Sequence, residues 1–268
     1  MELKIFSKDN KEIGVKKMPL QFSEPSRFDI IKRAVEVIFG NNRQRYGANP
    51  RAGKRHSVYL SKKRRRFRGV YGHSRTRTPK KVMSRSGAMF NWTGAFAPNA
   101  RGGHRAFPPK ANKIWACKIN KKERKKAIRS ALASSLNKDL VVKRGHKIPD
   151  AYPFIISNDF ESISKTKDLF KILNVLGFKK EFERSSKKKI RPGKGKSRAR
   201  PYKKSKGPLI VVSDNCKLLN TAKNIAGMDV IDIKNINVEL LAPGCVPGRL
   251  TLFTEKAVDR IEKEGLFV

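Results

Sequence analysis

The segment 97–110 reads A-P-N-A-R-G-G-H-R-A-F-P-P-K and combines residue types that could carry out chemistry. Gly102 and Gly103 could offer backbone N–H groups to a phosphate, and His104 could act as a general base. A catalytic histidine needs a second group to orient it, usually a carboxylate. Because the sequence has no Asp or Glu from 37 to 122, the catalytic interpretation is weak, and nothing marks a nucleotide as the ligand.

Other enzyme motifs are equally weak. The G-K-S at Gly195–Ser197 lacks the earlier glycine of a phosphate-binding P-loop, because Ile190 stands there. The G-x-S-x-G nucleophile elbow is absent, which leaves only a Ser-His-Asp set assembled in space as an open alternative. The carboxylates expected at strand ends are interpreted as helix caps or turn formers: Asp159, Glu161, Asp214, Asp229 and Asp232. The dispersed cysteines, Cys117, Cys216 and Cys245, predict neither disulfides nor a zinc site.

The formal net charge of +41, from 63 Lys and Arg against 22 Asp and Glu, is far outside the ordinary range. Since self-repulsion costs folding free energy, this imbalance indicates a polyanionic partner, and nucleic acid is the natural one. Apolar runs such as Pro208–Val212 fall short of the roughly 20 residues of a membrane-spanning helix. The N-terminal residues also lack the apolar region of a secretory signal. We therefore expect a cytoplasmic protein without a membrane partner.

Two acid-free segments carry most of the charge. One, between Glu36 and Glu123, holds 23 Lys and Arg, and the other, between Glu183 and Asp214, holds 12 more; the rest of the chain has a net charge of only +6. The first predicts an extended loop over 41–113, because it shows no sustained period of 2 or 3.6. Its interleaved aromatic residues suit RNA, since flat side chains stack on unpaired bases. The second predicts a shorter RNA-binding insertion over 187–207.

The remaining residues, 1–40 and 114–268, alternate between apolar strands and amphipathic helices. This alternation predicts an α/β sandwich, a mostly parallel sheet with helices on both faces. Strands are expected at 1–6, 12–18, 151–157, 208–213, 228–233 and 249–253, helices at 26–39, 120–136, 163–176, 218–225 and 254–264, and a turn at 238–241. In the first helix Ser26 is the expected N-cap and Gly40 the stop. In the second, Asn120 and Glu123 have capping-box spacing.

Several motifs, in order along most of the chain, resemble the universal large-subunit ribosomal protein family four in its archaeal/eukaryotic form, and archaeal members most. They are F-D-I-I-K-R-A-V (Phe28–Val35), A-R-G-G-H-R-A-F-P-P-K (Ala100–Lys110), I-N-K-K-E-R-K-K-A-I-R-S-A-L-A (Ile119–Ala133), R-G-H (Arg144–His146), R-P-G-K-G-K-S-R-A-R (Arg191–Arg200), G-P-L-I-V-V-S (Gly207–Ser213) and L-A-P-G-C-V-P-G-R-L-T-L-F-T-E (Leu241–Glu255). Pro192 and Cys245 depart from the family pattern, which has Ala and Gly there.

The resemblance implies a structural constituent of the large ribosomal subunit, not an enzyme. The α/β domain would lie on the outside of the subunit, and the long loop would pass through ribosomal RNA to the polypeptide exit tunnel. There its tip, 72–81, would form a constriction with large-subunit protein family twenty-two and face the nascent polypeptide. The expected tunnel-facing residues are His73, Arg75, Arg77, Lys80 and Lys81. No protein cofactor is expected, and structural Mg²⁺ or K⁺ would sit on the RNA.

The residues expected to bind RNA share positive charge, an aromatic ring, or a glycine that lets the backbone approach closely. In the first segment they are Arg43, Arg45, Arg51, Lys54, Arg55, Lys62, Lys63, Arg64, Arg65, Arg66, Arg68, Arg85, Trp92, Arg101, Gly102, Gly103, His104, Arg105, Phe107 and Lys110. In the second they are Lys188, Arg191, Lys194, Lys196, Arg198, Arg200, Tyr202 and Lys203. Two alternatives stay open: a free RNA-binding regulator that represses a messenger, and a nucleic-acid-processing enzyme.

Overall fold

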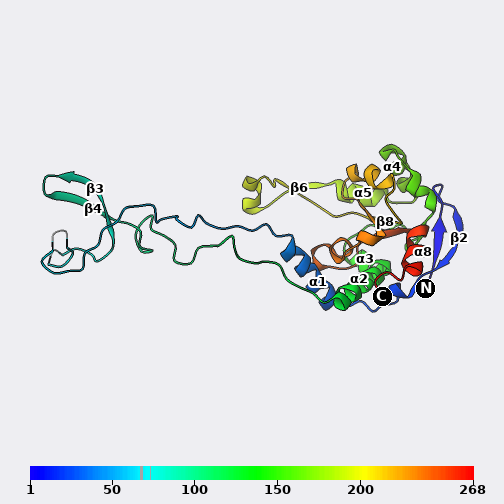
Figure 1. Ribbon diagram of the computed structural model, residues 1–268. Coiled ribbons are helices and arrows are strands. Elements are labelled where there is room, and N and C mark those ends of the chain that lie inside the picture. Colours follow the sequence, from blue (N-terminus) through cyan, green and yellow to red (C-terminus); the bar gives the residue numbers. More distant parts are fainter. Residues whose placement is uncertain (67–68, 73) are drawn as a thin grey trace. The chain divides into compact units, whose positions relative to one another are not determined.

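The computed structural model describes residues 1–66, 69–72 and 74–268; the expected contacts Arg68 and His73 lie outside this part of the chain. The chain forms two compact units. Unit 1 contains Met1–Asn42 together with Cys117–Val268, and unit 2 contains Arg43–Ala116. Figure 1 shows the labelled elements of both.

Unit 1 is built on a six-stranded sheet in the order β2-β1-β5-β10-β8-β9. The strands are β1 (Glu2–Phe6), β2 (Glu12–Lys17), β5 (Ile155–Ile156), β8 (Leu209–Val212), β9 (Asp229–Asp232) and β10 (Thr251–Thr254). β2 pairs antiparallel with β1, and the other neighbouring strands pair in parallel. The prediction of a mostly parallel sheet is therefore confirmed.

Helices cover both faces of this sheet, because alternate residues of the buried strands point to opposite sides. Leu209 and Val211 of β8 belong to one apolar cluster, and Ile210 and Val212 to the other. The first cluster also contains residues of α1 (Phe28–Asn41), α2 (Lys121–Leu136), α7 (Val238–Leu241) and α8 (Glu255–Lys263). The second contains residues of α3 (Lys138–Lys143), α4 (Thr166–Val175), α5 (Lys179–Ser186) and α6 (Leu218–Thr221). The predicted α/β sandwich is thus confirmed.

The boundaries of the first helix differ from those expected. Ser26 does not cap α1: its Oγ lies 2.6 Å from the Ser134 Oγ of α2, and Arg27 occupies the N-cap position without a side-chain hydrogen bond. A contact between helices has replaced the local cap. Gly40 does not stop the helix either, since α1 continues to Asn41. Both expectations were wrong because helix packing outweighs the local preferences of single residues.

The second helix begins where expected, at the N-cap Asn120, but no capping box forms. The Asn120 side chain makes no capping hydrogen bond, and the Glu123 carboxylate instead lies 3.2 Å from Arg33 of α1. Other differences are small: α4 begins at Thr166, 218–225 divides into α6 and a 3₁₀ turn, and the expected turn 238–241 is α7. The sequence patterns did not indicate α3 or α5.

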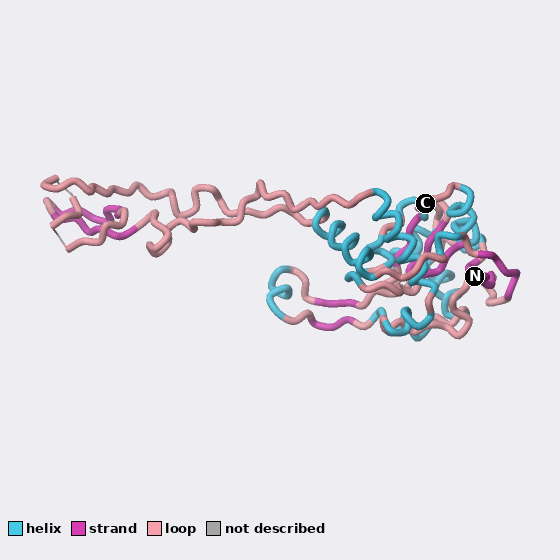
Figure 2. The backbone as a smooth tube through the Cα atoms, turned by 90° about the horizontal axis from the view of Figure 1, so that it is seen from below, coloured by secondary structure: helices cyan, strands magenta, loops and turns pink. Residues whose placement is uncertain are grey.

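Each acid-free segment contains a β-hairpin. In unit 2, β3 (Lys80–Ser86) pairs antiparallel with β4 (Met89–Gly94). This hairpin contradicts the expectation that the segment lacks regular structure. In the second segment, β6 (Lys188–Ile190) pairs with β7 (Tyr202–Lys204), and a 3₁₀ turn at Gly193–Arg198 lies between them. Figure 2 shows the two strands side by side, closed by this turn.

Candidate nucleic-acid interface

The β3–β4 hairpin organises one end of unit 2. Its strands are joined to the preceding chain by a backbone bridge in which the Tyr59 N–H donates to the Lys80 carbonyl at 2.9 Å. Lys80, Lys81 and Arg85 come from β3, and Trp92 comes from β4. The register pairs Lys81 with Thr93 and Arg85 with Phe90. The hairpin therefore fixes the backbone that carries these side chains.

The G-G-H turn is held by contacts within the protein. Gly102 has a φ of +71°, which favours glycine, and a Cβ on Gly103 would lie only 1.9 Å from the Ala97 carbonyl oxygen. The backbone N–H of His104 donates to the Phe96 carbonyl at 3.1 Å, and its ring Nδ1–H donates to the same oxygen. Both glycines thus have a reason within the fold, and the histidine has a positioning partner that is not a carboxylate.

The predicted cations of unit 2 are exposed. Among the described residues this holds for Arg43, Arg45, Arg51, Lys54, Arg55, Lys62, Lys63, Arg64, Arg65, Arg66, Arg75, Arg77, Arg85, Arg101, Arg105 and Lys110. Lys80 and Lys81 are half-buried, and the Lys80 ammonium donates to the Thr76 carbonyl at 2.6 Å. Phe107 is exposed, whereas Trp92 and His104 are half-buried. The side chains are therefore available to an external partner.

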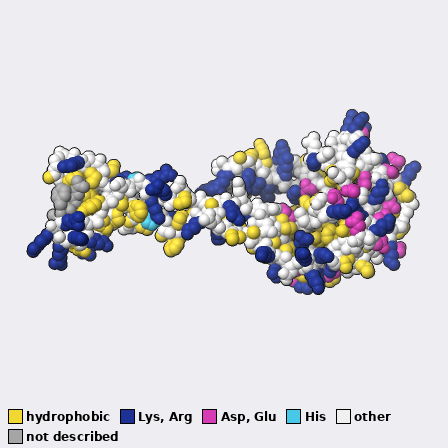
Figure 3. Space-filling model, viewed as in Figure 1, with side chains coloured by type: hydrophobic (Ala, Val, Ile, Leu, Met, Phe, Trp, Pro, Cys, Tyr) yellow, Lys and Arg dark blue, Asp and Glu magenta, His cyan; other side chains and the backbone are white. Residues whose placement is uncertain are grey.

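No carboxylate neutralises this charge from within the unit. The sequence of 43–116 contains no Asp or Glu, and no ion pair among the described residues includes one of its Lys or Arg side chains. On the face drawn in Figure 3, the acidic side chains lie over unit 1, where many cations are paired. The excess charge of unit 2 can be neutralised only from outside, as an RNA backbone would do.

The hairpin of the second segment carries like charges directly across from one another. Lys188 lies opposite Lys204, and Lys189 lies opposite Lys203, with all four side chains exposed. Such pairs are destabilising unless an anion lies near them. The predicted contacts Lys194, Lys196, Arg198, Arg200 and Tyr202 are also exposed. The arrangement concentrates positive charge on a small, ordered element.

Arg191 differs from its neighbours because it is half-buried and braces the hairpin. Its Nε donates to the Arg200 carbonyl at 3.0 Å, and its Nη2 donates to the Tyr202 carbonyl at 3.2 Å. The side chain therefore holds the two arms together across the turn. Its expected RNA contact stays a prediction alongside this internal role.

The base of the second segment is fixed to the rest of unit 1 by two arginines, Arg249, which is buried, and Arg184, which is half-buried. Arg249 has no exposed surface; its Nε donates to the Gly207 carbonyl at 2.9 Å and its Nη2 to the Asp229 carboxylate at 2.6 Å. Arg184 Nη2 donates to the Lys206 carbonyl at 2.6 Å. Burial lowers the pKa of Arg249, although Asp229 opposes the shift. These contacts position the point from which the basic hairpin leaves the sheet.

Arg184 also belongs to a buried polar cluster with His146 and Glu181. Glu181 accepts hydrogen bonds from His146 Nδ1 at 2.7 Å, from Arg184 Nη2 at 2.6 Å and from the Lys147 N–H at 2.9 Å. Burial raises the pKa of Glu181, but the hydrogen bonds from Arg184, His146 and Lys147 outweigh it, and the net pKa lies below the ordinary value. Burial lowers the pKa of His146 and outweighs the opposing Glu181 contact. The buried Glu181 carboxylate is thus satisfied by its neighbours, as a structural role requires.

Of the strand-end carboxylates expected to be helix caps or turn formers, Asp232 forms a turn, whereas Glu161 and Asp229 contact side chains of other elements instead. Glu161 accepts from Ser213 Oγ at 2.8 Å and from Thr254 Oγ1 at 2.7 Å. Asp232 accepts from the Lys234 N–H at 2.9 Å, as a turn former does. Within residues 1–66, 69–72 and 74–268, no group of three or more His, Cys, Asp or Glu side chains could hold a metal ion. The same residues contain no helix long and apolar enough to cross a membrane.

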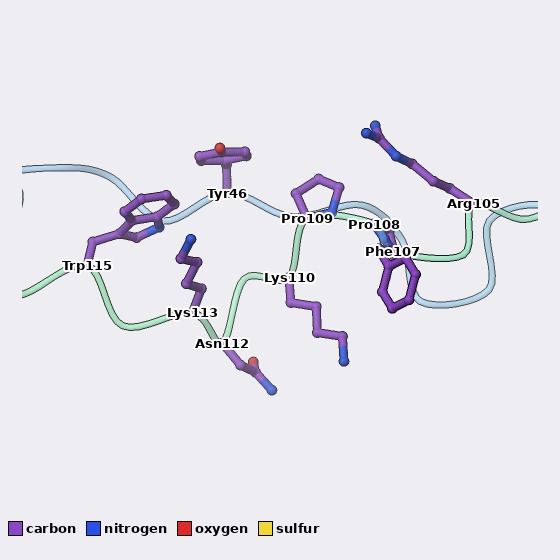
Figure 4. Close-up of a pocket in the computed structure, with 9 residues that line it drawn as sticks. All are labelled: Tyr46, Arg105, Phe107, Pro108, Pro109, Lys110, Asn112, Lys113 and Trp115. Carbon is purple, nitrogen blue, oxygen red and sulfur yellow. The ribbon is translucent and has the colours of Figure 1, made fainter.

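One cluster of unit 2, built around Trp115, was not predicted from the sequence. The Tyr46 and Trp115 rings stack with their centroids 6.0 Å apart, and the Arg43 guanidinium lies 3.7 Å from the Trp115 ring centroid. Lys113 places its ammonium 4.2 Å from the same ring. Figure 4 shows Tyr46, Lys113 and Trp115 along a pocket that Phe107 also lines. The expected loop ended at Lys113 and so left out Trp115; the alternation of aromatic and basic residues was the available signal.

Comparison with known proteins agrees with this architecture. Residues 17–264 match the model of the Ribosomal protein L4/L1 family. The chain is 45% identical to the Large ribosomal subunit protein uL4 of Nanoarchaeum equitans over 268 residues, which is 100% of both chains. It is 40% identical to the protein of the same name from Archaeoglobus fulgidus, over 90% of both chains, and 38% identical to that from Methanococcus vannielii, over 98% of this chain and 99% of the relative. The chain therefore belongs to the ribosomal protein L4/L1 family.

Proposed function

We propose that this protein is a structural constituent of the large ribosomal subunit, in the cytoplasm, and that it binds and organises ribosomal RNA through its two acid-free segments. The relatives at 38–45% identity are all named as large-subunit ribosomal proteins. This is a family of structural proteins, and the chain is not an enzyme. Ribosomal RNA and other large-subunit proteins are the partners.

One observation carries the RNA-binding part of the proposal. Unit 2 exposes a dense set of cations, has no carboxylate in its sequence, and forms no ion pair of its Lys and Arg among the described residues. A folded segment with this charge is disfavoured by self-repulsion until an anion neutralises it. RNA phosphates supply that charge at close, regular spacing, so ordering of the segments is coupled to binding.

Co-sedimentation tests the proposal. The full chain should travel one-to-one with large subunits and stay bound after a moderate salt wash. A free regulator of a messenger would instead be released from the subunit and sediment slowly. Recovery of the chain mainly in the slow fractions would contradict the structural role while leaving RNA binding intact.

The finer proposal places 72–81 at the exit tunnel, opposite large-subunit protein family twenty-two and beside the nascent polypeptide. Arg75 and Arg77 are exposed, and the Arg77 guanidinium lies 4.9 Å from the Tyr71 ring centroid. Reversing both charges to Glu should change translation arrest or sensitivity to drugs that bind the tunnel, with normal assembly. Reversing Arg51 and Arg55 together, two exposed cations in another part of unit 2, is the matched control. An identical response in both double variants would contradict the tunnel assignment.

A further inference from the structure

A trough in unit 2 gathers aromatic rings from two stretches of chain that are distant in sequence. The cavity measures about 770 Å³ and is lined by Tyr46 from the first stretch and by Phe107, Pro108, Pro109 and Trp115 from the second. Its volume lies within the roughly 300–1,000 Å³ of small-ligand sites. Figure 4 shows the prolines between the Tyr46 and Trp115 rings at one end and the Phe107 ring at the other.

The Tyr46 ring has two neighbours within unit 2, Trp115 and the Arg43 guanidinium, which lies 5.5 Å from the Tyr46 ring centroid. It stacks on Trp115 with an interplanar angle of 19°. Arg43 and Lys113 both lie against the Trp115 ring, so cation–π attraction holds that ring in place. Tyr46 nevertheless remains 51% exposed. A ring that is fixed by its neighbours and still open to solvent loses little entropy when a flat ligand stacks on it.

Phe107 forms the second open ring of the trough. Its side chain is 91% exposed, although it sits between ordered residues. Pro108 and Pro109 follow it and restrict the backbone, and the Pro109 carbonyl accepts from the Ala48 N–H at 2.9 Å. That hydrogen bond ties the two stretches of the trough together. The position of Phe107 is therefore set by the backbone, without any burial of its ring.

The charged lining identifies the ligand. Arg105, Lys110 and Lys113 line the same cavity as the rings, and unit 2 has no carboxylate in its sequence. Flat rings that alternate with cations are the means by which proteins hold single-stranded RNA, since bases stack on the rings and phosphates meet the cations. An RNA duplex keeps its bases stacked inside and would leave the rings without partners.

We propose that this trough binds an unpaired segment of RNA, with nucleobases stacked on Tyr46 and Phe107 and phosphates held by Arg105, Lys110 and Lys113. The inference rests on the proposed RNA-binding function and adds that the RNA at this place is single-stranded. Lys113 and Trp115 thereby gain a role that the sequence patterns did not assign, and Tyr46, one of the interleaved aromatic residues, gains a specific one.

The test uses the full chain and a short single-stranded RNA that carries one 2-aminopurine, whose fluorescence falls when the base stacks. The wild-type chain should quench the probe. Tyr46→Ala and Phe107→Ala should each abolish much of the quenching and weaken binding about tenfold, equivalent to about 1.4 kcal/mol, within the range for loss of one stacked base. Tyr46→Phe and Phe107→Tyr keep a ring and should restore both signals. Affinity for an RNA duplex of equal length should change less than about twofold.

A matched control removes charge outside the trough. Lys63→Ala deletes an exposed cation and should weaken single-stranded and duplex RNA equally. If both ring deletions leave probe binding and quenching unchanged while the chain still binds ribosomal RNA, the trough proposal fails and the general function stands. If the wild-type chain binds no RNA, the function itself fails. If polyglutamate binds the wild-type chain and Tyr46→Ala abolishes that binding, the ligand is an acidic peptide and the proposal is overturned.

Discussion

At the scale of single residues, Glu181 shows how unit 1 tolerates a buried charge. Its carboxylate has no exposed surface and accepts hydrogen bonds from Arg184, His146 and the Lys147 amide. The ion pair with Arg184 is local, three residues along α5, and the bond to His146 joins α5 to the residues after α3. Removing one member would leave the other polar groups partly unpaired, and unpaired buried polar groups lower the free energy of unfolding.

Replacing Glu181 by Gln should lower the free energy of unfolding by about 3 kcal/mol at pH 7, because the half-buried Arg184 guanidinium loses its counter-charge and the buried site loses acceptors for its hydrogen bonds. It should also change the pH dependence. The folded-state pKa values of Glu181 and His146 both lie below their ordinary values, so the unfolded chain binds more protons in acid. Stability is therefore complete above the unfolded pKa of His, about 6.5, and is lost as the pH falls through the folded pKa values.

Denaturant unfolding between pH 4 and pH 7.5 measures both effects. The wild-type chain should lose stability as the pH falls. In Glu181→Gln the part of this loss that belongs to the carboxylate, at the acid end of the range, should disappear, whereas the part that belongs to His146 should persist, because the lost Glu181 contact raised the His146 pKa. Glu183→Gln, an exposed carboxylate on the same helix, is the control and should resemble the wild type. Equal curves for all three proteins would contradict the assignment.

The G-G-H turn of unit 2 depends most directly on Gly103. A Cβ there would lie 1.9 Å from the Ala97 carbonyl oxygen, so Gly103→Ala must displace the backbone. In the chain bound to ribosomal RNA, where unit 2 is ordered on the proposed function, we expect faster hydrogen exchange across 95–105, including the His104 N–H that donates to Phe96. Gly102→Asn is the control, because a Cβ there meets no described atom within 4 Å and Asn tolerates its positive φ. Slow exchange in Gly103→Ala equal to that of the wild type would show that the turn is not packed this way.

At the scale of elements, the sheet and its long helices could be predicted from the sequence, because buried strands and amphipathic helices have strong periodic patterns. β8, with four buried apolar residues, is an example.

The helix caps could not be predicted from the sequence, because their residues bond to partners that are distant in sequence. Ser26 bonds to Ser134, and Glu123 lies against Arg33. The β3–β4 hairpin was missed because a register shift between Val82 and Ser84 interrupts its alternation. The basic side chains of the candidate interface were found from composition, whereas the stacking of Tyr46 on Trp115 depends on how two distant stretches meet.

The β6–β7 hairpin gives a prediction at this scale. Lys189→Glu would place an acid directly opposite Lys203 and replace a repulsive pair by an attractive one. The free protein should then protect the hairpin amides better, while affinity for ribosomal RNA falls because the net positive charge decreases by two units. Lys189→Gln is the control and should lie between the wild type and Lys189→Glu in both measurements. Tighter RNA binding by Lys189→Glu would contradict the interpretation of this hairpin as a phosphate-binding element.

At the scale of the whole molecule, the two units solve different physical problems. Unit 1 folds by burying apolar residues on both faces of its sheet and by pairing its charges. Unit 2 buries few apolar side chains among its described residues, notably Val70 and Ala95, and cannot neutralise itself. We infer that unit 1 keeps its structure alone, and that unit 2 gains most of its order from a partner. On the proposed function, the part of the chain that folds alone is thus separate from the part that binds RNA.

This division predicts how RNA affinity depends on salt. Residues 43–116 can be replaced by a short Gly-Ser linker, because the Cys117 N–H donates to Asn41 Oδ1 at 3.0 Å and the two ends lie together in unit 1. The shortened chain should keep the unfolding midpoint of unit 1. Its plot of log affinity against log salt concentration should become much shallower. Each phosphate contact contributes about 0.7–0.9 to the slope, so loss of about ten contacts would reduce it by about 7–9.

A charge control separates specific contacts from net charge. Replacing Lys11, Lys17 and Lys167, three exposed cations of unit 1, by Gln should leave the slope within about one unit of the wild type, because these side chains lie outside both acid-free segments. If the salt dependence of RNA affinity fell by as much per removed charge in this triple variant as in the shortened chain, RNA affinity would depend only on the net charge of the molecule. If it did not, the affinity would depend on where the cations lie, as the separation into a paired body and an unpaired basic unit requires.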